Sequence, residues 1–356
     1  MNVAGHWDVV IAGGRIAGAA TAWALAPYAE RILVVDASRA DTFWAQQSTW
    51  DRAGNQEWDE LGLLDTVLAC GAPRTFGHDF RTGNDVVEHH YPQVDDYGFR
   101  MSVPREVLDP ALMQTAESRG NVTVVRPARV RDVALRNGRV TGATVRTAYG
   151  DQPVTSDLLV LADGRRSRNA TDLGARPYRT VRSPWVAMLA YYEDLPLPTD
   201  RAYFSMSGGS ILIATPCGRN QWCIASDVHF EVHGSTGEHP AAAYARLVNE
   251  EPLLGPAVAR GRRTTAVAGA GRLWMLRRPM TGPGWALVGD SGYHLDPVTA
   301  QGTRAALATT RLLRDRVTAH GQIAGLDLDG LTGERDAALD EAWDETEQVC
   351  HRRSSL

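Results

Sequence analysis

The chain has 356 residues, of which 44% are hydrophobic and 22% charged, and its formal net charge is −5. This composition is typical of a folded globular protein of one or two domains, and it provides no basic field for nucleic acid or an anionic membrane. All 37 basic residues are arginine. The absence of lysine excludes Schiff-base chemistry, a Walker-A phosphate loop and a lysine general base.

The N-terminal residues lead almost directly into an apolar segment, without the pattern of a secretory signal peptide. No window approaches 18 uninterrupted apolar residues, so we expect a cytoplasmic protein with no membrane span. The four cysteines are scattered, and we expect reduced thiols rather than a disulfide framework.

The first 36 residues predict a β-α-β unit. Two short apolar runs, 7–12 and 31–35, flank an alanine-rich helix at 16–26. This order predicts two parallel strands joined by a crossover helix, in a sheet that is covered on both faces.

Residues 43–162 are expected to leave the first sheet and then return to it. Residues 43–75 are expected to be mostly helix and loop, 76–100 show weak strand signals, and 105–119 predict a helix. Asn137-Gly138 lies between two alternating runs and predicts a hairpin turn, because both residues tolerate a positive φ. The predicted strands are 121–125, 130–135, 140–146 and 158–162.

From about residue 180 the pattern changes to short strands separated by turn residues, which predicts an antiparallel sheet. These strands are 186–192, 202–206, 210–214 and 221–226. A helix is expected at 240–249, and a buried strand at 285–288 returns the chain to the first sheet. Helices are expected at 302–319 and at about 334–352.

A nucleotide-binding fingerprint lies between the first strand and the first helix. Its residues are Gly13, Gly14, Arg15, Ala17 and Gly18. A dinucleotide pyrophosphate would dock there on the helix N-terminus, and Gly18 would let the helix pack closely on the strand. Arg15 replaces the second glycine of the usual pattern, and its guanidinium would instead meet phosphate or adenine. The alternative is a structural turn without a ligand.

Three acidic motifs follow at strand ends. Asp36 ends the second strand, where a carboxylate receives the adenosine ribose hydroxyls. Asp163-Gly164 follows the strand at 158–162, and Gly289-Asp290 follows the strand at 285–288. With these motifs, residues 7–175 and 273–315 resemble the FAD-dependent monooxygenase superfamily of the para-hydroxybenzoate hydroxylase type, nearest its geranylgeranyl reductase-like branch.

The resemblance implies a Rossmann-like α/β FAD-binding domain with β-α-β units, interrupted by an antiparallel-sheet substrate domain and followed by a C-terminal helix. The FAD-binding domain is expected to comprise 1–75, 101–175 and 279–320. The substrate domain would comprise 76–100 and 176–278, and 321–356 would form the C-terminal helical segment.

The resemblance also implies roles for individual residues. Asp163 and Gly164 would shape the pyrophosphate site, and Asp290 would bind ribityl or ribose hydroxyls. Arg105 would open the helix of an R-x-x-L-x-x-x-L pattern.

Pro297 and the turn 299–302, with Gln301 and Gly302, resemble the loop beside the flavin ring, where Ala300 replaces a glycine. The helix that starts there would stabilise negative charge on the reduced flavin. His294 and Asp296 lie just before this loop and are candidate catalytic residues; the alternative is that they only fix the loop.

Other constellations are weaker. Gly289-Asp290-Ser291-Gly292 lacks the last glycine of a serine-hydrolase elbow. His229 and His233 lie on a strand-like run, so we expect a solvated loop and no metal site. The arginine pairs Arg165-Arg166, Arg262-Arg263 and Arg277-Arg278 are expected at the solvated surface; the alternative is that they attract an anionic nicotinamide cofactor or an acidic substrate.

The resemblance implies an FAD-dependent monooxygenase that hydroxylates or epoxidises a small apolar organic substrate with O2 through a flavin C4a-peroxide. NAD(P)H would bind transiently, or a separate flavin reductase would supply the electrons. The alternatives are an ene-reductase of the geranylgeranyl reductase-like type and a non-catalytic flavin-binding protein. Flavin-dependent halogenation is disfavoured, because the chain has no lysine and no W-x-W-x-I-P motif.

Overall fold

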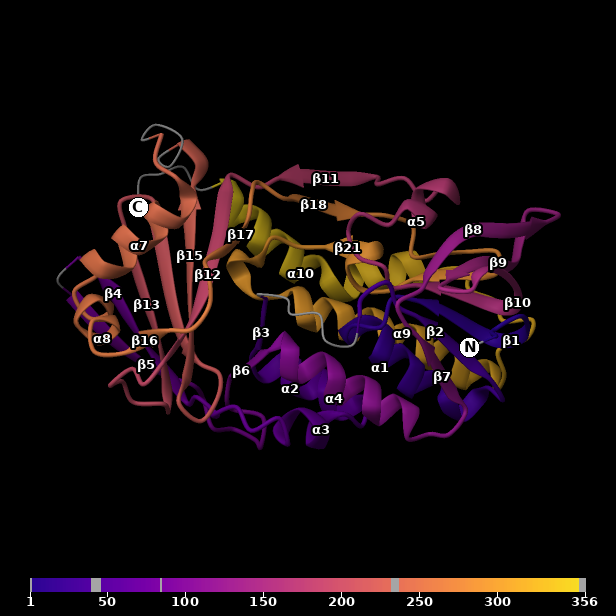
Figure 1. Cartoon of the computed structure of the whole chain (residues 1–356), viewed down its shortest axis with the longest axis horizontal. Coiled ribbons are helices and arrows are strands. Elements are labelled where there is room, and N and C mark those ends of the chain that lie inside the picture. Colours follow the sequence, from indigo (N-terminus) through magenta and orange to yellow (C-terminus); the bar gives the residue numbers. More distant parts are fainter. Residues whose placement is uncertain (1, 40–45, 84, 232–236, 352–356) are drawn as a thin grey trace.

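The computed structural model describes residues 2–39, 46–83, 85–231 and 237–351 (Figure 1). Five parallel strands form the centre of its first sheet, in the order β20-β10-β1-β2-β7. Their bounds are β1 Gly5–Ala12, β2 Ile32–Val35, β7 Val122–Val125, β10 Gly150–Leu161 and β20 Trp285–Leu287. The apolar runs of β1, β2 and β10 are buried because both faces of the sheet are covered.

Helices cover one face of this sheet. Alternate residues of β1, Val9 and Ile11, face the helical layer, while Val10 and Ala12 face the other side. The helices of this layer are α1 Ile16–Leu25, α2 Arg52–Glu60, α3 Leu64–Leu68, α4 Arg105–Glu117 and α9 Gly302–His320. The opposite face is covered by β8 Arg129–Arg136, β9 Arg139–Thr147 and α5 Arg168–Asp172.

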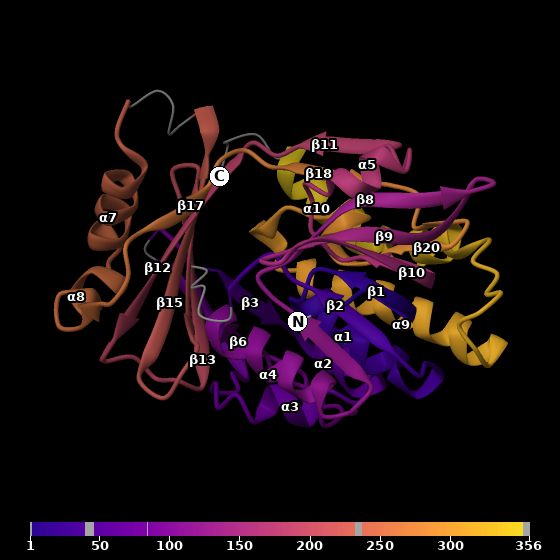
Figure 2. The same ribbon diagram turned by 45° about the vertical axis from the view of Figure 1, so that its right-hand side comes forward.

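The second large sheet is mostly antiparallel and stands at the other end of the molecule (Figures 1 and 2). Its order is β16-β12-β15-β14-β13-β4-β5, and β17 also pairs with β12. The bounds are β4 Gly77–Thr82, β5 Asp85–His90, β12 Trp185–Glu193, β13 Arg201–Ser207, β14 Ser210–Pro216, β15 Gln221–His229, β16 Arg262–Arg263 and β17 Ala268–Ala270. Helices α7 Pro240–Glu250 and α8 Leu254–Val258 pack on one face of it.

Smaller elements connect the two sheets. They are the pair β3 Gln47–Trp50 and β6 Met101–Pro104, and the three-stranded sheet β11 Arg179–Arg182, β18 Trp274–Arg277 and β21 Tyr293–His294. β19 Thr281–Gly282 pairs with β20, and short 3-10 turns cover Ala26–Tyr28, Gly289–Ser291 and Pro297–Thr299. The last helix, α10 Leu331–His351, packs against α9. None of the helices described is long and apolar enough to cross a membrane.

The expected fold class is confirmed: a parallel α/β sheet, an antiparallel sheet within the chain and a C-terminal helix. The Asn137-Gly138 turn has positive φ at both residues, as predicted. Residues 76–100 supply β4 and β5, and β4 pairs with β13 across about 120 residues of sequence. The exact domain boundaries stay a prediction.

Two local expectations were wrong. His229 lies in β15 and is buried rather than solvated, because the strand extends beyond residue 226; His233 lies outside the described residues. Arg277 and Arg278 are 4% and 6% exposed, since α10 and the three-stranded sheet cover them.

Candidate flavin site

The turn after β1 depends on two glycines. Gly13 has a φ of +105°, and a Cβ at this position would collide with the carbonyl of Ala162 at the end of β10. A Cβ on Gly18 would collide with the carbonyl of Gly13. The turn therefore brings the start of α1 close to two strand ends, which is how a dinucleotide turn presents helix N–H groups.

Asp36 lies against this turn, as predicted from the sequence. The residue is 8% exposed, and its Oδ1 accepts hydrogen bonds from the Ser38 N–H at 3.0 Å and the Ser38 hydroxyl at 2.9 Å. Its Oδ2 faces Gly14, where a Cβ would come within 2.8 Å of it. The carboxylate is held in place while one oxygen lies beside the glycine turn, which suits it to receive ribose hydroxyls.

Arg15 belongs to a cluster of charges that joins several predicted residues. Its Nη1 donates to Gln46 Oε1 at 3.2 Å. Burial lowers the pKa of Arg15, the Arg105 charge lowers it further, and Asp109, Asp36 and Asp290 oppose both effects. The structure thus brings Arg15, Arg105, Asp36 and Asp290 within electrostatic reach, although they come from four segments of the chain.

Arg105 begins α4, and its guanidinium makes two hydrogen bonds to the Asp109 carboxylate, at 2.8 and 3.0 Å. Burial raises the pKa of Asp109, and the Arg105 charge opposes this shift. Sequence reasoning missed Asp109, although its i, i+4 spacing from Arg105 on a predicted helix was a usable signal. The pair fixes the direction of Arg105.

Asp163 and Gly164 follow β10 as predicted. The Asp163 carboxyl accepts a hydrogen bond from Asn169 Nδ2 at 3.2 Å. The residue remains open to solvent, yet burial among protein atoms raises its pKa, against hydrogen bonds from Ser167 and Asn169. A carboxyl that is both surrounded and accessible can be reached by a ligand. Gly164 has a φ of +85° with open space at its Cβ position.

The position of the Gly289-Asp290 motif depends on the lack of a side chain at Gly289. It has a φ of +60°, and a Cβ there would lie 2.8 Å from the Cβ of Ala17 in α1. The 3-10 turn that carries Asp290 therefore packs directly on the first helix. Asp290, predicted to bind hydroxyls, is brought to the same edge of the sheet as the glycine turn.

Within the described part of the chain, two helices, α1 and α9, have N-termini without a side-chain cap or an acidic residue in the first turn. By contrast, the Asp51 side chain caps α2. A Cβ on Gly302, at the start of α9, would meet nothing within 4 Å among the described residues. Uncapped helix N-termini favour anions, so α1 suits a pyrophosphate and α9 suits negative charge on a reduced flavin.

The loop before α9 is tied to the C-terminal helix. The hydroxyls of Thr299 and Thr346 are 2.7 Å apart, and Gln301 Nε2 donates to Glu345 Oε2 at 3.3 Å. Ala300 has a φ of +56°, a left-handed conformation that favours glycine. Pro297, Gln301 and Gly302 thus lie on a loop that α10 holds in a strained shape.

The two candidate catalytic residues are buried. His294 Nδ1 is 2.8 Å from the Trp274 carbonyl, and its Nε2 is 4.0 Å from Asp290 Oδ2. Asp296 is 2% exposed and accepts a hydrogen bond from the Val298 N–H at 3.0 Å. These contacts fix the loop, and a catalytic role for either residue stays a prediction.

Arg335 is a second residue near the candidate site that could not be identified from the sequence. It lies in α10 and is fully buried, and it donates to the carbonyls of Gly292 at 3.3 Å and Arg278 at 2.8 Å. Nothing in the sequence indicated this role, because Arg335 lies in another helix and 43 residues after Gly292.

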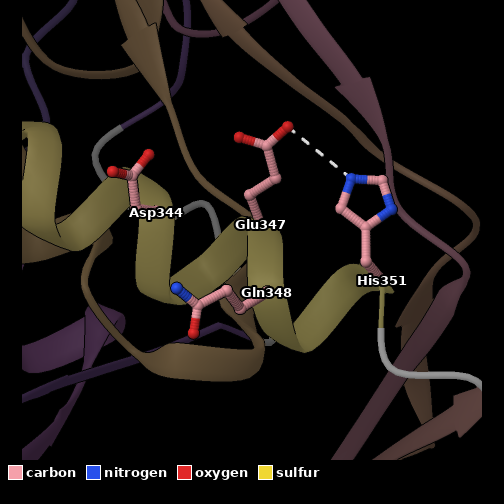
Figure 3. Close-up of a pocket in the computed structure, with 4 residues that line it drawn as sticks. All are labelled: Asp344, Glu347, Gln348 and His351. Atoms are coloured by element: carbon pink, nitrogen blue, oxygen red, sulfur yellow. Dashed lines mark ion pairs between the residues drawn. The ribbon is translucent and has the colours of Figure 1, made fainter.

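Two further groups of polar residues lie outside this site. Asp344, Glu347, Gln348 and His351 of α10 line a pocket in which Glu347 and His351 form an ion pair (Figure 3). His6, Asp8 and Asp157 place three metal-ligand atoms within 4.8 Å, at the amino end of β1. Neither group contains a residue predicted to bind FAD.

Comparison with known proteins agrees with this geometry. The family described as FAD binding domain matches residues 6–312. The chain belongs to this family, which is one of FAD-dependent oxidoreductases and monooxygenases.

Individual relatives are distant. The chain is 25% identical to squalene monooxygenase SE1 of Panax ginseng over 88% of its own length, and it spans about three fifths (59%) of that relative. It is 26% identical to ubiquinone hydroxylase UbiL of Rhodospirillum rubrum, over 90% of this chain and 74% of UbiL. The fold is similar to that of the myxobacterial chondrochloren halogenase CndH, with a TM-score of 0.82 and 21% identity over 98% of this chain and 84% of that one.

The residues present fit FAD. The placed Asp36 carboxylate would hold the adenosine end, and the glycine turn with the N-terminus of α1 would hold the pyrophosphate. The N-terminus of α9 would serve the flavin end. Arg15 does not remove this fit, because its charge is compatible with a pyrophosphate.

Proposed function

We propose that this protein is an FAD-dependent monooxygenase that hydroxylates or epoxidises a small, largely apolar organic molecule. When bound and reduced, FAD would supply electrons and activate O2. The observation that carries the proposal is an apolar, half-exposed face of the antiparallel sheet, turned toward the loop that opens α9. Squalene monooxygenases and the ubiquinone hydroxylase among the relatives support the same class of reaction.

That face can be traced strand by strand. In the middle of β12 and β14 the residues on this face are half-buried, whereas Met188 and Leu212, which lie between them on the other face, are buried. Its half-buried members are Ala187, Leu189, Phe204, Met206, Ile211, Ile213 and Ala225. Tyr191, on the same face, donates its hydroxyl hydrogen to the Gln46 carbonyl at 2.8 Å, so this end of the face lies against the segment just before β3.

The protein residues would bind and position rather than act as acids or bases. Asp36 and the α1 N-terminus would fix the adenosine end, and the α9 N-terminus would stabilise negative charge at the ring. The apolar face would keep water from the reacting atoms. NAD(P)H would bind transiently, or a separate reductase would supply electrons, because the sequence carries one dinucleotide fingerprint.

The test is to reconstitute the purified protein with FAD, reduce it anaerobically, and add either squalene or a phenol before admitting air. Incorporation of one atom of ¹⁸O₂ into a product supports the proposal. Reoxidation of the flavin by the alkene without O2 would instead support the ene-reductase of the geranylgeranyl reductase-like type. Reoxidation by air with no product from a wider panel would favour a non-catalytic flavin-binding protein.

A further inference from the structure

One carboxyl group interrupts the apolar sheet face. Asp227 of β15 pairs in register with Ala187 of β12 and Ile211 of β14, both half-buried and apolar. Asp227 itself is 4% exposed. A charged group is costly in such a place unless it is paired or neutral.

No described residue compensates this carboxyl. It receives no hydrogen bond and no cation from the part of the chain that the structure describes. Burial, with the Asp296 charge adding to it, raises the pKa of Asp227 to about 8. Burial also raises the pKa of Asp296, but hydrogen bonds from Ser183 and Val298 oppose this shift and stabilise its charged form. Of the two carboxyls, Asp227 therefore keeps its proton at neutral pH.

Other polar atoms beside Asp227 also have no partner. Trp185 and His229 are paired across β12 and β15, with ring centroids 5.5 Å apart, and lie two residues along their strands from Ala187 and Asp227, on the same face. Neither Trp185 Nε1 nor His229 Nδ1 has a hydrogen-bond partner among the described residues. Buried polar groups are normally satisfied, so three such groups on one face indicate a ligand that satisfies them.

The position of this group relates it to the flavin loop. Asp296, whose charge acts on Asp227, is the residue that directly precedes Pro297 and caps the turn Pro297–Thr299. A molecule held at Asp227 would therefore lie beside the loop that opens α9. The titratable groups around Asp227 are His229 on its own strand and Asp296, with His294 and Cys350 beside Asp296.

We propose that Asp227 is a specificity-determining residue, which donates a hydrogen bond from its neutral carboxyl to a hydroxyl or carbonyl oxygen of an otherwise apolar, uncharged substrate. The inference rests on the proposed function and adds the chemical class of its substrate. Anionic substrates are disfavoured, because Asp296 already places a negative charge at this point. Purely apolar molecules would leave the Asp227 hydroxyl hydrogen without an acceptor.

The test uses three probes of similar shape: 2-naphthol, 2-methylnaphthalene and naphthalene-2-carboxylate. Their binding to the FAD-loaded protein is measured at pH 7 by equilibrium dialysis, and shifts in the flavin spectrum report proximity to the ring. We expect 2-naphthol to bind about tenfold more tightly than the other two, as one buried hydrogen bond would give.

Variants separate recognition from folding. Asp227→Ala should abolish the preference for 2-naphthol, while Asp227→Asn, which keeps a donor and the side-chain shape, should retain part of it. Ser226→Ala is the matched control, because Ser226 is also buried and unpartnered but faces α7 and α8. Ala225→Leu should weaken all three probes equally by filling the apolar face.

Equal binding of the three probes, no detectable binding of any probe, or a 2-naphthol preference that survives in Asp227→Ala would overturn the inference. These results would leave the proposed function intact if the protein still binds FAD and incorporates oxygen. Conversely, a protein that binds no FAD would refute the proposed function, while dialysis would still decide whether Asp227 recognises the hydroxyl group.

Discussion

Arg335 on the C-terminal helix donates a hydrogen bond to the carbonyl of Gly292, 43 residues earlier in the chain, at 3.3 Å. Gly292 directly follows the turn that carries Asp290, so this contact ties α10 to the flavin motif. The same guanidinium holds the carbonyl of Arg278 and pairs with Asp336 at 2.8 Å. The C-terminal helix thus acts as a support for the candidate site.

We expect Arg335→Met to lower the free energy of unfolding by about 2 to 3 kcal/mol, because it removes the Arg335 donor from the buried Arg278 carbonyl and takes away one of the partners of Asp336. Urea unfolding followed by circular dichroism measures this change. Arg168→Ala is the control; its side chain is 89% exposed, and it should change stability by less than about 0.5 kcal/mol. An Arg335→Met protein as stable as the control would contradict the supporting role of α10.

Ala300→Gly should stabilise the protein by roughly 0.5 kcal/mol. The reason is that relief of the left-handed conformation at Ala300 outweighs the extra freedom of glycine in the unfolded chain. Ala338→Gly, at an exposed position inside α10, should have the opposite sign and cost about 1 kcal/mol. Thermal unfolding of both variants shows whether each substitution raises or lowers stability. A loss of stability in Ala300→Gly would contradict backbone strain at Ala300.

Asp36→Ala should weaken FAD binding about 10- to 100-fold, because charge-assisted hydrogen bonds to the ribose hydroxyls are lost. Asp36→Asn keeps an acceptor oxygen for Ser38 and should lose less. The dissociation constant is measured by quenching of flavin fluorescence on binding. Asp172→Asn, at an exposed position of α5, is the control and should bind FAD like the unmodified protein.

Asp227 should also make stability depend on pH. Its folded-state pKa of about 8 lies above the ordinary value of 3.8, so between these values the folded state binds more protons than the unfolded state. Its contribution to stability is therefore complete below about pH 4 and is lost as pH rises toward 8. Asp227→Asn has no such proton, so its advantage over the unmodified protein should grow by up to about 1.4 kcal/mol per pH unit in this window.

Urea unfolding of both proteins at pH 5, 6.5 and 8 measures this difference. Asp172→Asn serves again as the control, since an exposed carboxyl should show no such trend. A constant difference between Asp227→Asn and the unmodified protein across the three pH values would show that Asp227 is ionised throughout.

The parts of the site that could be predicted are those in which function and local backbone coincide. Gly13, Gly18 and Asp36 belong to one β-α-β unit, so their spacing alone indicates the turn and the carboxylate beside it. Asp163 and Gly289 were found for the same reason, because each directly follows a buried strand. Asp109 was within reach of this reasoning, because its partner lies one helical turn away.

Other residues could not be placed in this way because their environment comes from distant segments. The sequence around Asp227 reads as an ordinary strand, and nothing local shows that apolar side chains from β12 and β14 surround it. Arg278 and Arg335 look like solvated arginines until α10 packs over the three-stranded sheet.

The sequence by itself determined the β-α-β core and the position of each motif at a strand end, since these depend on periodicity and on residues close in the chain. The class of cofactor followed from the resemblance of these motifs to a known family. The tertiary structure alone decided which charges are buried and what they meet. Burial changes the energy of a carboxyl or guanidinium far more than its sequence neighbours do, and burial is set by contacts between segments that the chain keeps far apart.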